Sequence, residues 1–192
     1  YAWLVDAFVR LAEATGEARW ITSAREAADG MLALFWDEDG GGLFTTGDDA
    51  ERLIVRSKDL LDGATPSANS VASVALLRLG ALTGESVYAE RGEELLHLVG
   101  QVLTQHPAAL TWALGAVDML VTGTTEIAVV GERRDLVEAI QRRYLPNAVL
   151  AWGEPYGGPL WSERSEDKAY VCHNSTCQAP VTSVPDLLAQ LP

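Results

Sequence analysis

The feature that most limits the fold of this chain is an internal repeat. The repeat consists of pairs that share one constant offset: Arg10-Leu11 and Arg78-Leu79, Thr15-Gly16-Glu17 and Thr83-Gly84-Glu85, Trp20 and Tyr88, and Glu26 and Glu94. Apolar residues recur at helical spacing on both sides of each glycine, so each copy predicts a helical hairpin. Repeated hairpins bury their apolar faces against one another, as in solenoids and closed α/α toroids, and two hairpins are too few to close a ring.

The periodicity of the chain changes after Gly123. Before this residue, five successive helices are predicted over residues 1–15, 20–36, 66–84, 87–103 and 107–121. After it, strands are predicted over residues 126–131, 148–152 and 169–172, with helices over residues 135–144 and 184–191. The predicted fold class is mainly α, with a partial α/α toroid of helical hairpins over residues 1–122 and a small α/β tail over residues 123–192.

Charge and hydropathy exclude several classes of function. The chain has 14 Lys and Arg residues against 27 Asp and Glu residues, so nucleic acid and anionic membrane surfaces should be repelled. We find neither an apolar run of membrane-spanning length nor a secretory signal, and we expect a soluble, cytoplasmic protein. The chain begins at Tyr1, inside a predicted helix, which suggests that sequence upstream is missing.

The long connection between the second and third predicted helices is the best candidate for a functional site. Its polar residues, which lie beside a helix N-terminus, are Asp48, Asp49, Glu51, Arg56, Lys58, Asp59, Asp62, Ser67 and Asn69. Loops at one end of a toroid surround its cavity, so these side chains could hold sugar hydroxyls, with a carboxylate as acid or base. We predict a catalytic role for Asp62, and the predicted ligand-binding residues are Arg56, Lys58, Asp59, Ser67 and Asn69.

A structural interpretation of the same connection stays open beside this one. Here Asp62 and Ser67 cap the following helix, and the two basic side chains pair with Asp59 or Glu51. Sequence alone leaves the choice between the two interpretations unmade.

The chain contains two cysteines, and neither metal nor redox chemistry is expected of them. Cys172 and Cys177 lack both the two-residue gap of thioredoxin-type motifs and the four-ligand set of a structural zinc site. We expect a buried strand cysteine and a second free thiol in the following loop. Because Gly131 alone does not make a dinucleotide-binding turn, no cofactor and no metal are predicted.

Two separated segments resemble the YyaL-like family, which includes the spermatogenesis-associated thioredoxin-domain-containing proteins. The segment Lys58–Ser70 resembles one family signature, and Ala169–Thr182 is similar to the C-terminal signature. Residues 126–131 and 144–147 also follow the family pattern, so the resemblance covers essentially the whole chain. Ser57 stands where the family often has Pro, and Ala68 stands where Gly is common.

The resemblance implies that the chain is the C-terminal part of a larger protein. That protein would have an N-terminal thioredoxin-like domain and a toroid of six helical hairpins like those of glycosidases and of N-acylglucosamine 2-epimerase. Those epimerases depend on toroid histidines, whereas none of His97, His106 and His173 lies in the polar connection.

Two functions follow as alternatives. The chain could belong to a carbohydrate-related toroid that binds a saccharide-like ligand, with any glycosidase- or epimerase-like activity confined to the full-length protein. Alternatively, it could be a non-catalytic scaffold that works with the missing thioredoxin-like domain in cis.

Overall fold

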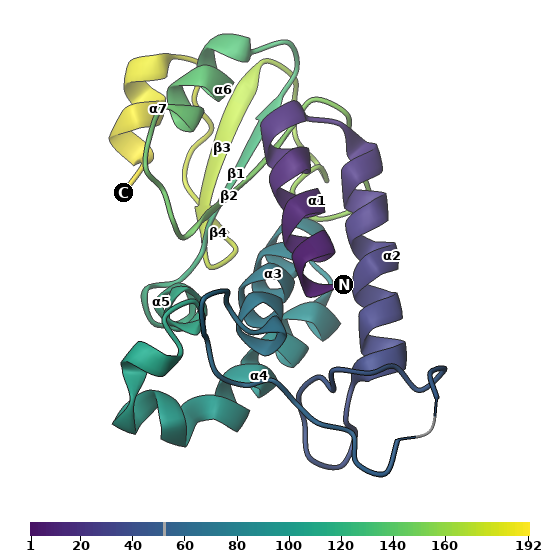
Figure 1. Cartoon of the computed structure of the whole chain (residues 1–192). Coiled ribbons are helices and arrows are strands. Elements are labelled where there is room, and N and C mark those ends of the chain that lie inside the picture. Colours follow the sequence, from purple (N-terminus) through teal and green to yellow (C-terminus); the bar gives the residue numbers. More distant parts are fainter. Residues whose placement is uncertain (52) are drawn as a thin grey trace.

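The structure is a computed structural model that describes residues 1–51 and 53–192 (Figure 1). Its elements, in chain order, are α1 (Ala2–Thr15), α2 (Ala18–Phe35), α3 (Ala68–Thr83), α4 (Ser86–Gln105), the short 3₁₀ helix η1 (Pro107–Ala109), α5 (Ala113–Thr122), β1 (Thr125–Val130), α6 (Arg134–Gln141), β2 (Ala148–Trp152), β3 (Lys168–His173), β4 (Thr176–Cys177) and α7 (Val184–Gln190). The prediction of a mainly helical chain with a small α/β tail is confirmed, whereas the toroid stays a prediction.

The two repeats form two helical hairpins, α1–α2 and α3–α4. Both first helices end at a glycine in the left-handed conformation, Gly16 with φ 72° and Gly84 with φ 74°. Residues that carry a side chain rarely adopt such φ values, so glycine is the residue that allows the chain to reverse at both points. Ser67, one of the two caps expected for α3, accepts the N–H of Ser70 at 3.1 Å.

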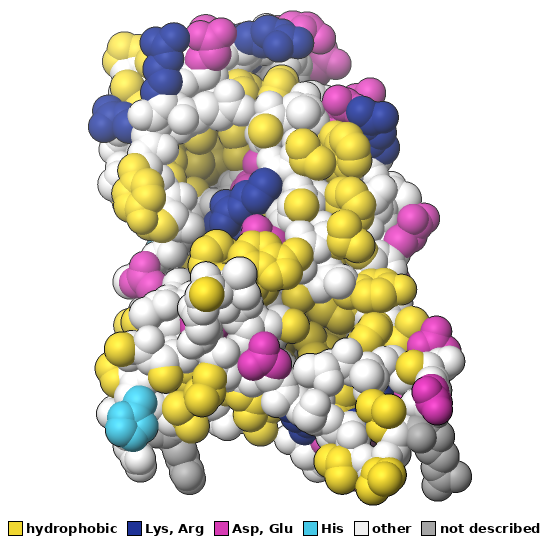
Figure 2. Space-filling view, viewed as in Figure 1, with side chains coloured by type: hydrophobic (Ala, Val, Ile, Leu, Met, Phe, Trp, Pro, Cys, Tyr) yellow, Lys and Arg dark blue, Asp and Glu magenta, His cyan; other side chains and the backbone are white. Residues whose placement is uncertain are grey.

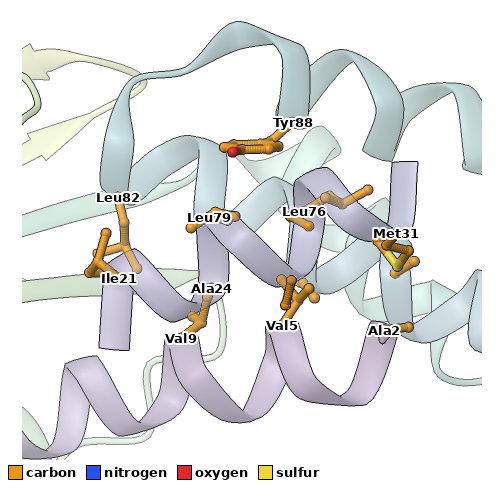
Figure 3. Close-up of a cluster of buried hydrophobic side chains, with 14 of the residues drawn as sticks. Ala2, Val5, Val9, Ile21, Ala24, Met31, Leu76, Leu79, Leu82 and Tyr88 are labelled. Atoms are coloured by element: carbon orange, nitrogen blue, oxygen red, sulfur yellow. The ribbon is translucent and has the colours of Figure 1, made fainter. Parts of the chain in front are cut away.

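Helix α3 lies at the centre of the helical core. Figure 3 shows Leu76, Leu79 and Leu82 of α3 facing residues of α1 and α2, with Tyr88 of α4 above them. Nearly every residue of α3 is buried, including polar ones. A helix that is buried all round must have neighbours on every side, and α3 contacts α1, α2, α4, α5 and β2.

The four-stranded sheet has the order β2-β1-β3-β4. Strands β1 and β2 are parallel and are joined through α6, whereas β3 runs antiparallel to both β1 and β4. Alternate residues of β1 face opposite sides: Ile127 and Val129 pack with α6 and α7, and Ala128 joins the helical core. Figure 1 shows α6 and α7 on the side of the sheet away from α1.

The tail therefore packs directly on the hairpins. Arg78 of α3, which is 2% exposed, donates to the carbonyl oxygens of Pro146 and Ala148 at 3.0 and 2.6 Å. Val149 and Ala151 of β2 belong to the same buried cluster as the hairpin residues. The boundary between residues 122 and 123 stays a prediction.

The single helix expected over residues 107–121 is wrong, because it is divided into η1 and α5. Between them, Leu110 is fully buried, and the N–H of Trp112 donates to the carboxylate of Asp62. The carboxylate of a residue far away in the sequence thus accepts a backbone N–H at the break.

In the described part of the chain, no helix combines the length and apolar character needed to cross a membrane.

Candidate functional site

The long connection between α2 and α3 is held in shape by its own basic side chains. Lys58 Nζ lies 2.6 Å from Asp37 Oδ2 and also donates to the carbonyl oxygen of Gly41. The other carboxylate oxygen of Asp37 accepts the N–H of Gly40 at 3.1 Å. The hydrogen bond from Lys58, followed by that from Gly40, lowers the pKa of the Asp37 carboxyl.

Arg56 makes a second set of contacts within the connection. Its guanidinium pairs with Asp48 and donates to the carbonyl oxygens of Thr46 and Leu34, at 2.6 and 3.2 Å. It also lies over the ring of Phe44, 4.1 Å from the centroid. Arg56 therefore ties the connection to the last turn of α2.

The partners of these two basic side chains differ from the acids expected by the structural interpretation, Asp59 and Glu51. The connection doubles back, so that the N–H of Thr45 donates to the carbonyl oxygen of Ser57 at 2.8 Å. This pairing places residues 56–58 beside residues 37–48 rather than beside their neighbours in the sequence.

Asn69 is buried, with 3% of its surface exposed, and its side-chain amide forms hydrogen bonds with backbone groups. Its Oδ1 accepts the N–H of Leu43 at 2.7 Å, and its Nδ2 donates to the carbonyl oxygens of Leu43 and Asp59, at 3.0 and 2.7 Å. Asn69 thus joins the first turn of α3 to both limbs of the connection, and its polar atoms face protein rather than solvent.

Asp62 joins the N-terminus of α3 to the segment before α5. One carboxylate oxygen accepts the N–H of Ser67 at 2.9 Å, and the other accepts the N–H of Trp112 at 2.8 Å. The N–H of Asp62 donates to the carbonyl oxygen of Ala109 at 2.8 Å. Two backbone donors therefore occupy this carboxylate, which gives it a positioning role; its catalytic role stays a prediction.

Asp59 is the predicted site residue that borders a cavity. This cavity has a volume of about 230 Å³ and lies beside the aromatic rings of Tyr1, Phe35 and Phe44, with Ala68 of α3 also in its wall. Asp59 itself is exposed. Of the predicted residues, Asp62, Ser67 and Asn69 meet at the N-terminus of α3, while Arg56 and Lys58 lie in the paired limbs of the connection.

A larger cavity, of about 640 Å³, lies between α1, α3, α5 and the segment that precedes β2. Its wall contains two aromatic side chains, Trp112 and Tyr144, and three charged ones, Arg10, Asp118 and Arg143. Sequence analysis missed this cavity because its residues come from separate elements and form no motif. Within the described part of the chain, none of the six predicted site residues lines it, although Asp62 holds the N–H of Trp112.

The wall of this larger cavity is fixed by side-chain contacts. Asn147 Nδ2 donates to Asp118 Oδ2 at 2.6 Å and to Thr122 Oγ1 at 2.8 Å, which joins the segment before β2 to α5. The ring of Trp112 packs against that of Trp3, with centroids 5.4 Å apart. Figure 2 shows hydrophobic side chains gathered over α1 on this face of the molecule, with charged side chains both near its centre and toward its edges.

The expectation of two free thiols is wrong, because Cys172 and Cys177 form a disulfide. The two cysteines stand opposite each other in the β3–β4 hairpin. Asn174 and Ser175 form its turn, with φ values of 48° and 63°. Such a turn joins two adjacent strands, and asparagine at its first position is the signal in the sequence that indicates it. In the residues that the structure describes, no group of three or more potential ligands is placed to hold a metal ion.

None of the known protein-family models matches this sequence. The chain is 35% identical to human spermatogenesis-associated protein 20 over 201 residues, which cover 95% of this chain and 25% of the human protein. The rat protein of the same name is 34% identical with the same coverage, and an uncharacterized protein of Caenorhabditis elegans is 25% identical over 203 residues. The chain spans about a quarter of the length of the curated relatives it matches, and the resemblance inferred from its motifs is confirmed.

Proposed function

We propose that this chain is one segment of a larger protein, because it covers only a quarter of spermatogenesis-associated protein 20, which it resembles. We also propose that its cavity of about 640 Å³ binds a saccharide-like ligand. The observation that carries this proposal is the joint presence of aromatic and polar side chains around one cavity. Its volume lies within the range of roughly 300–1,000 Å³ that small-molecule sites occupy.

The chemistry of the cavity wall suits a polyhydroxylated ligand. Trp112 and Tyr144, which are 36% and 90% exposed, offer apolar faces against which the C–H groups of a sugar ring can pack. Arg10 and Arg143 offer donors, and the carboxylate of Asp118 offers an acceptor. This arrangement supports binding, and it assigns no bond-breaking step to the chain.

Asp62 takes a positioning role in this proposal. Its carboxylate accepts the N–H of Trp112, so it fixes the backbone from which the Trp112 ring projects. The polar connection would then influence the ligand through Trp112 rather than by direct contact.

The remaining hairpins of an α/α toroid would come from the part of the larger protein that this chain does not contain. Trp3, Leu4 and Leu11 of α1, and Tyr1 just before it, are exposed although they are large and apolar, which is the property of a helix face that packs against a neighbour. This face would receive a preceding hairpin, and the cavity would be completed by it.

The test is a thermal-unfolding screen of the chain, and of the larger protein, against mono- and disaccharides. A ligand present at about 100 times its Kd stabilises the folded state by roughly 2.7 kcal/mol, which raises Tm by several degrees. Trp112→Ala should abolish the shift. Trp20→Ala should retain it, because Trp20 stacks on Phe8 and does not line this cavity. Retention of the shift in Trp112→Ala would place the ligand elsewhere.

The second candidate function is a non-catalytic scaffold that works with a thioredoxin-like domain in cis. It is favoured by the same exposed apolar face. It is also favoured because the polar groups of Arg56, Lys58 and Asn69 bond to other groups of the protein rather than facing a ligand. If neither the chain nor the larger protein is stabilised by any sugar, this scaffold function replaces saccharide binding.

A further inference from the structure

The disulfide between Cys172 and Cys177 joins sulfur atoms in two very different environments. Cys172 lies in β3 and is 1% exposed, whereas Cys177 lies in the short outer strand β4 and is exposed. A thiol that approaches from solvent therefore reaches the Sγ of Cys177 first. Attack on one sulfur of a disulfide expels the other, so the buried Cys172 would be the leaving group.

A positive charge lies beside the leaving sulfur. Arg164 Nη2 is 3.5 Å from the Sγ of Cys172 and 3.8 Å from that of Cys177. Its guanidinium also lies over the ring of Tyr170, at 4.6 Å from the centroid, and burial lowers its pKa. Arginine nevertheless stays charged in proteins, so a thiolate formed at Cys172 would have a cation next to it.

A carboxyl group also lies beside this site. Glu126 stands opposite Cys172 in the β1–β3 pairing and accepts the N–H of Ser175 at 3.3 Å. Burial raises the pKa of the Glu126 carboxyl. A carboxyl that stays protonated to higher pH places less negative charge beside a departing thiolate.

We propose that Cys172 and Cys177 form a thiol–disulfide exchange site that reacts with a dithiol reductant, with Cys177 as the attacked sulfur and Cys172 as the sulfur released beside Arg164. In the first step, one thiolate of the dithiol bonds to Cys177 Sγ, the bond between the cysteines breaks, and Cys172 leaves as a thiolate. In the second step, the other thiolate of the dithiol attacks the first dithiol sulfur, which is bonded to Cys177, and Cys177 leaves as a thiolate. Two electrons pass to the protein, the dithiol becomes a disulfide, and its two protons are available to the two cysteine thiolates.

This site is independent of the saccharide proposal, because it lies at the opposite edge of the sheet from β2. It also revises the expectation that the cysteines have no redox chemistry. That expectation rested on the missing two-residue gap, whereas a β-hairpin brings together cysteines that are five positions apart.

The first test is the rate at which dithiothreitol reduces the disulfide in the folded chain, followed by alkylation and mass spectrometry. Arg164→Gln should slow reduction roughly three- to tenfold, because the leaving thiolate loses its adjacent cation. Arg164→Lys should stay near the original rate. Arg142→Gln, which removes an equally charged side chain from the exposed end of α6, should change the rate less than about twofold.

The second test needs no substitution. Glutathione, a monothiol, is added and the mixed disulfide is trapped at acid pH, so that peptide mapping shows which cysteine carries it. Glutathione on Cys177 is the expected result. Glutathione on Cys172, equal rates for Arg164→Gln and Arg142→Gln, or two free thiols in the protein equilibrated in an oxidising glutathione buffer would each overturn the proposal.

Discussion

The hairpins α1–α2 and α3–α4 have the same sequence pattern but different positions in the core. Helix α1 buries one stripe, consisting of Ala2, Val5, Val9 and Ala12, and exposes Trp3, Leu4 and Leu11. Helix α3 is buried on nearly all sides, and even its polar residues are covered. Repeated sequence thus specifies the hairpin, whereas the neighbours of each hairpin decide what its matching residues do.

The matching arginines show the difference most clearly. The side chain of Arg10 is 48% exposed and lies 3.6 and 3.7 Å from the carboxylates of Asp6 and Glu13. Arg78 is 2% exposed, lies 2.7 Å from Glu13 and donates to two carbonyl oxygens of the tail. The same residue type is a surface charge in one repeat and the link between helices and sheet in the other.

Replacing Arg78 should therefore have the largest effect. Arg78→Ala removes the buried charge partner of Glu13 and the side-chain donor to two backbone carbonyls, and we expect a loss of about 3–5 kcal/mol in the free energy of unfolding. Arg10→Ala should cost less than about 1 kcal/mol. Urea unfolding measures both, and Arg78→Lys, which keeps the charge without the planar fork, should fall between them. Equal losses at the two positions would remove the distinction between the hairpins.

The next largest effect should come from the two turn glycines. A Cβ at Gly84 would lie 2.5 Å from Pro159 Cδ, and a Cβ at Gly16 would lie 2.9 Å from the ring of Trp152. Left-handed backbone adds roughly 1–2 kcal/mol for a non-glycine residue, so Gly84→Ala should cost about 2–4 kcal/mol and Gly16→Ala somewhat less.

A third glycine provides the control for this pair. Gly100 lies inside α4, where a Cβ would meet no described atom within 4 Å. Gly100→Ala should stabilise the protein by roughly 0.5–1 kcal/mol, because alanine is the better helix former. If all three substitutions lower Tm by the same amount, then the close contacts of the tail with the two turn glycines do not affect stability.

These contrasts show which parts of the fold the sequence determines locally. Helical period and the terminating glycines act within a few residues, so the hairpins over residues 1–35 and 68–105 could be predicted. The central position of α3 could not, because Arg10 and Arg78 have closely similar sequence neighbours. Their difference arises from tertiary packing, because α3 contacts α4 and α5 as well as α1, α2 and β2, whereas α1 contacts mainly α2 and α3.

The candidate site was harder to predict, for a related reason. The polar residues near the N-terminus of α3 were identified, but Asp62 binds the N–H of Trp112, which is far away in the sequence. That contact lies at the break in the helix expected over residues 107–121, and it holds the backbone of Trp112, whose side chain lines the cavity. The cysteine pair is the exception, since its turn at Asn174 and Ser175 is local and was overlooked.

A smaller contrast concerns Tyr88 and its match in the first repeat, Trp20. The hydroxyl of Tyr88 donates to Asp29 Oδ1 at 2.8 Å, whereas Trp20 Nε1 has no hydrogen-bond partner among the described residues. Tyr88→Phe should cost about 1 kcal/mol. A double-mutant cycle with Asp29→Ala isolates the bond, and a coupling energy near zero would show that Tyr88 acts through packing alone.

The smallest effect separates burial from geometry. Thr15 and Thr83 make the same two bonds: each hydroxyl donates to the carbonyl oxygen four residues earlier at 2.8 Å and accepts the N–H two residues later at 3.3 Å. Thr15 is exposed and Thr83 is 4% exposed. Thr15→Val should cost a few tenths of a kcal/mol, because water can replace the hydroxyl, and Thr83→Val about 1 kcal/mol, because there the freed backbone groups lose their partner in a dry site. Since bond lengths and helix position match, a difference between the two unfolding free energies measures the effect of burial, and equal values would mean that solvent reaches both turns.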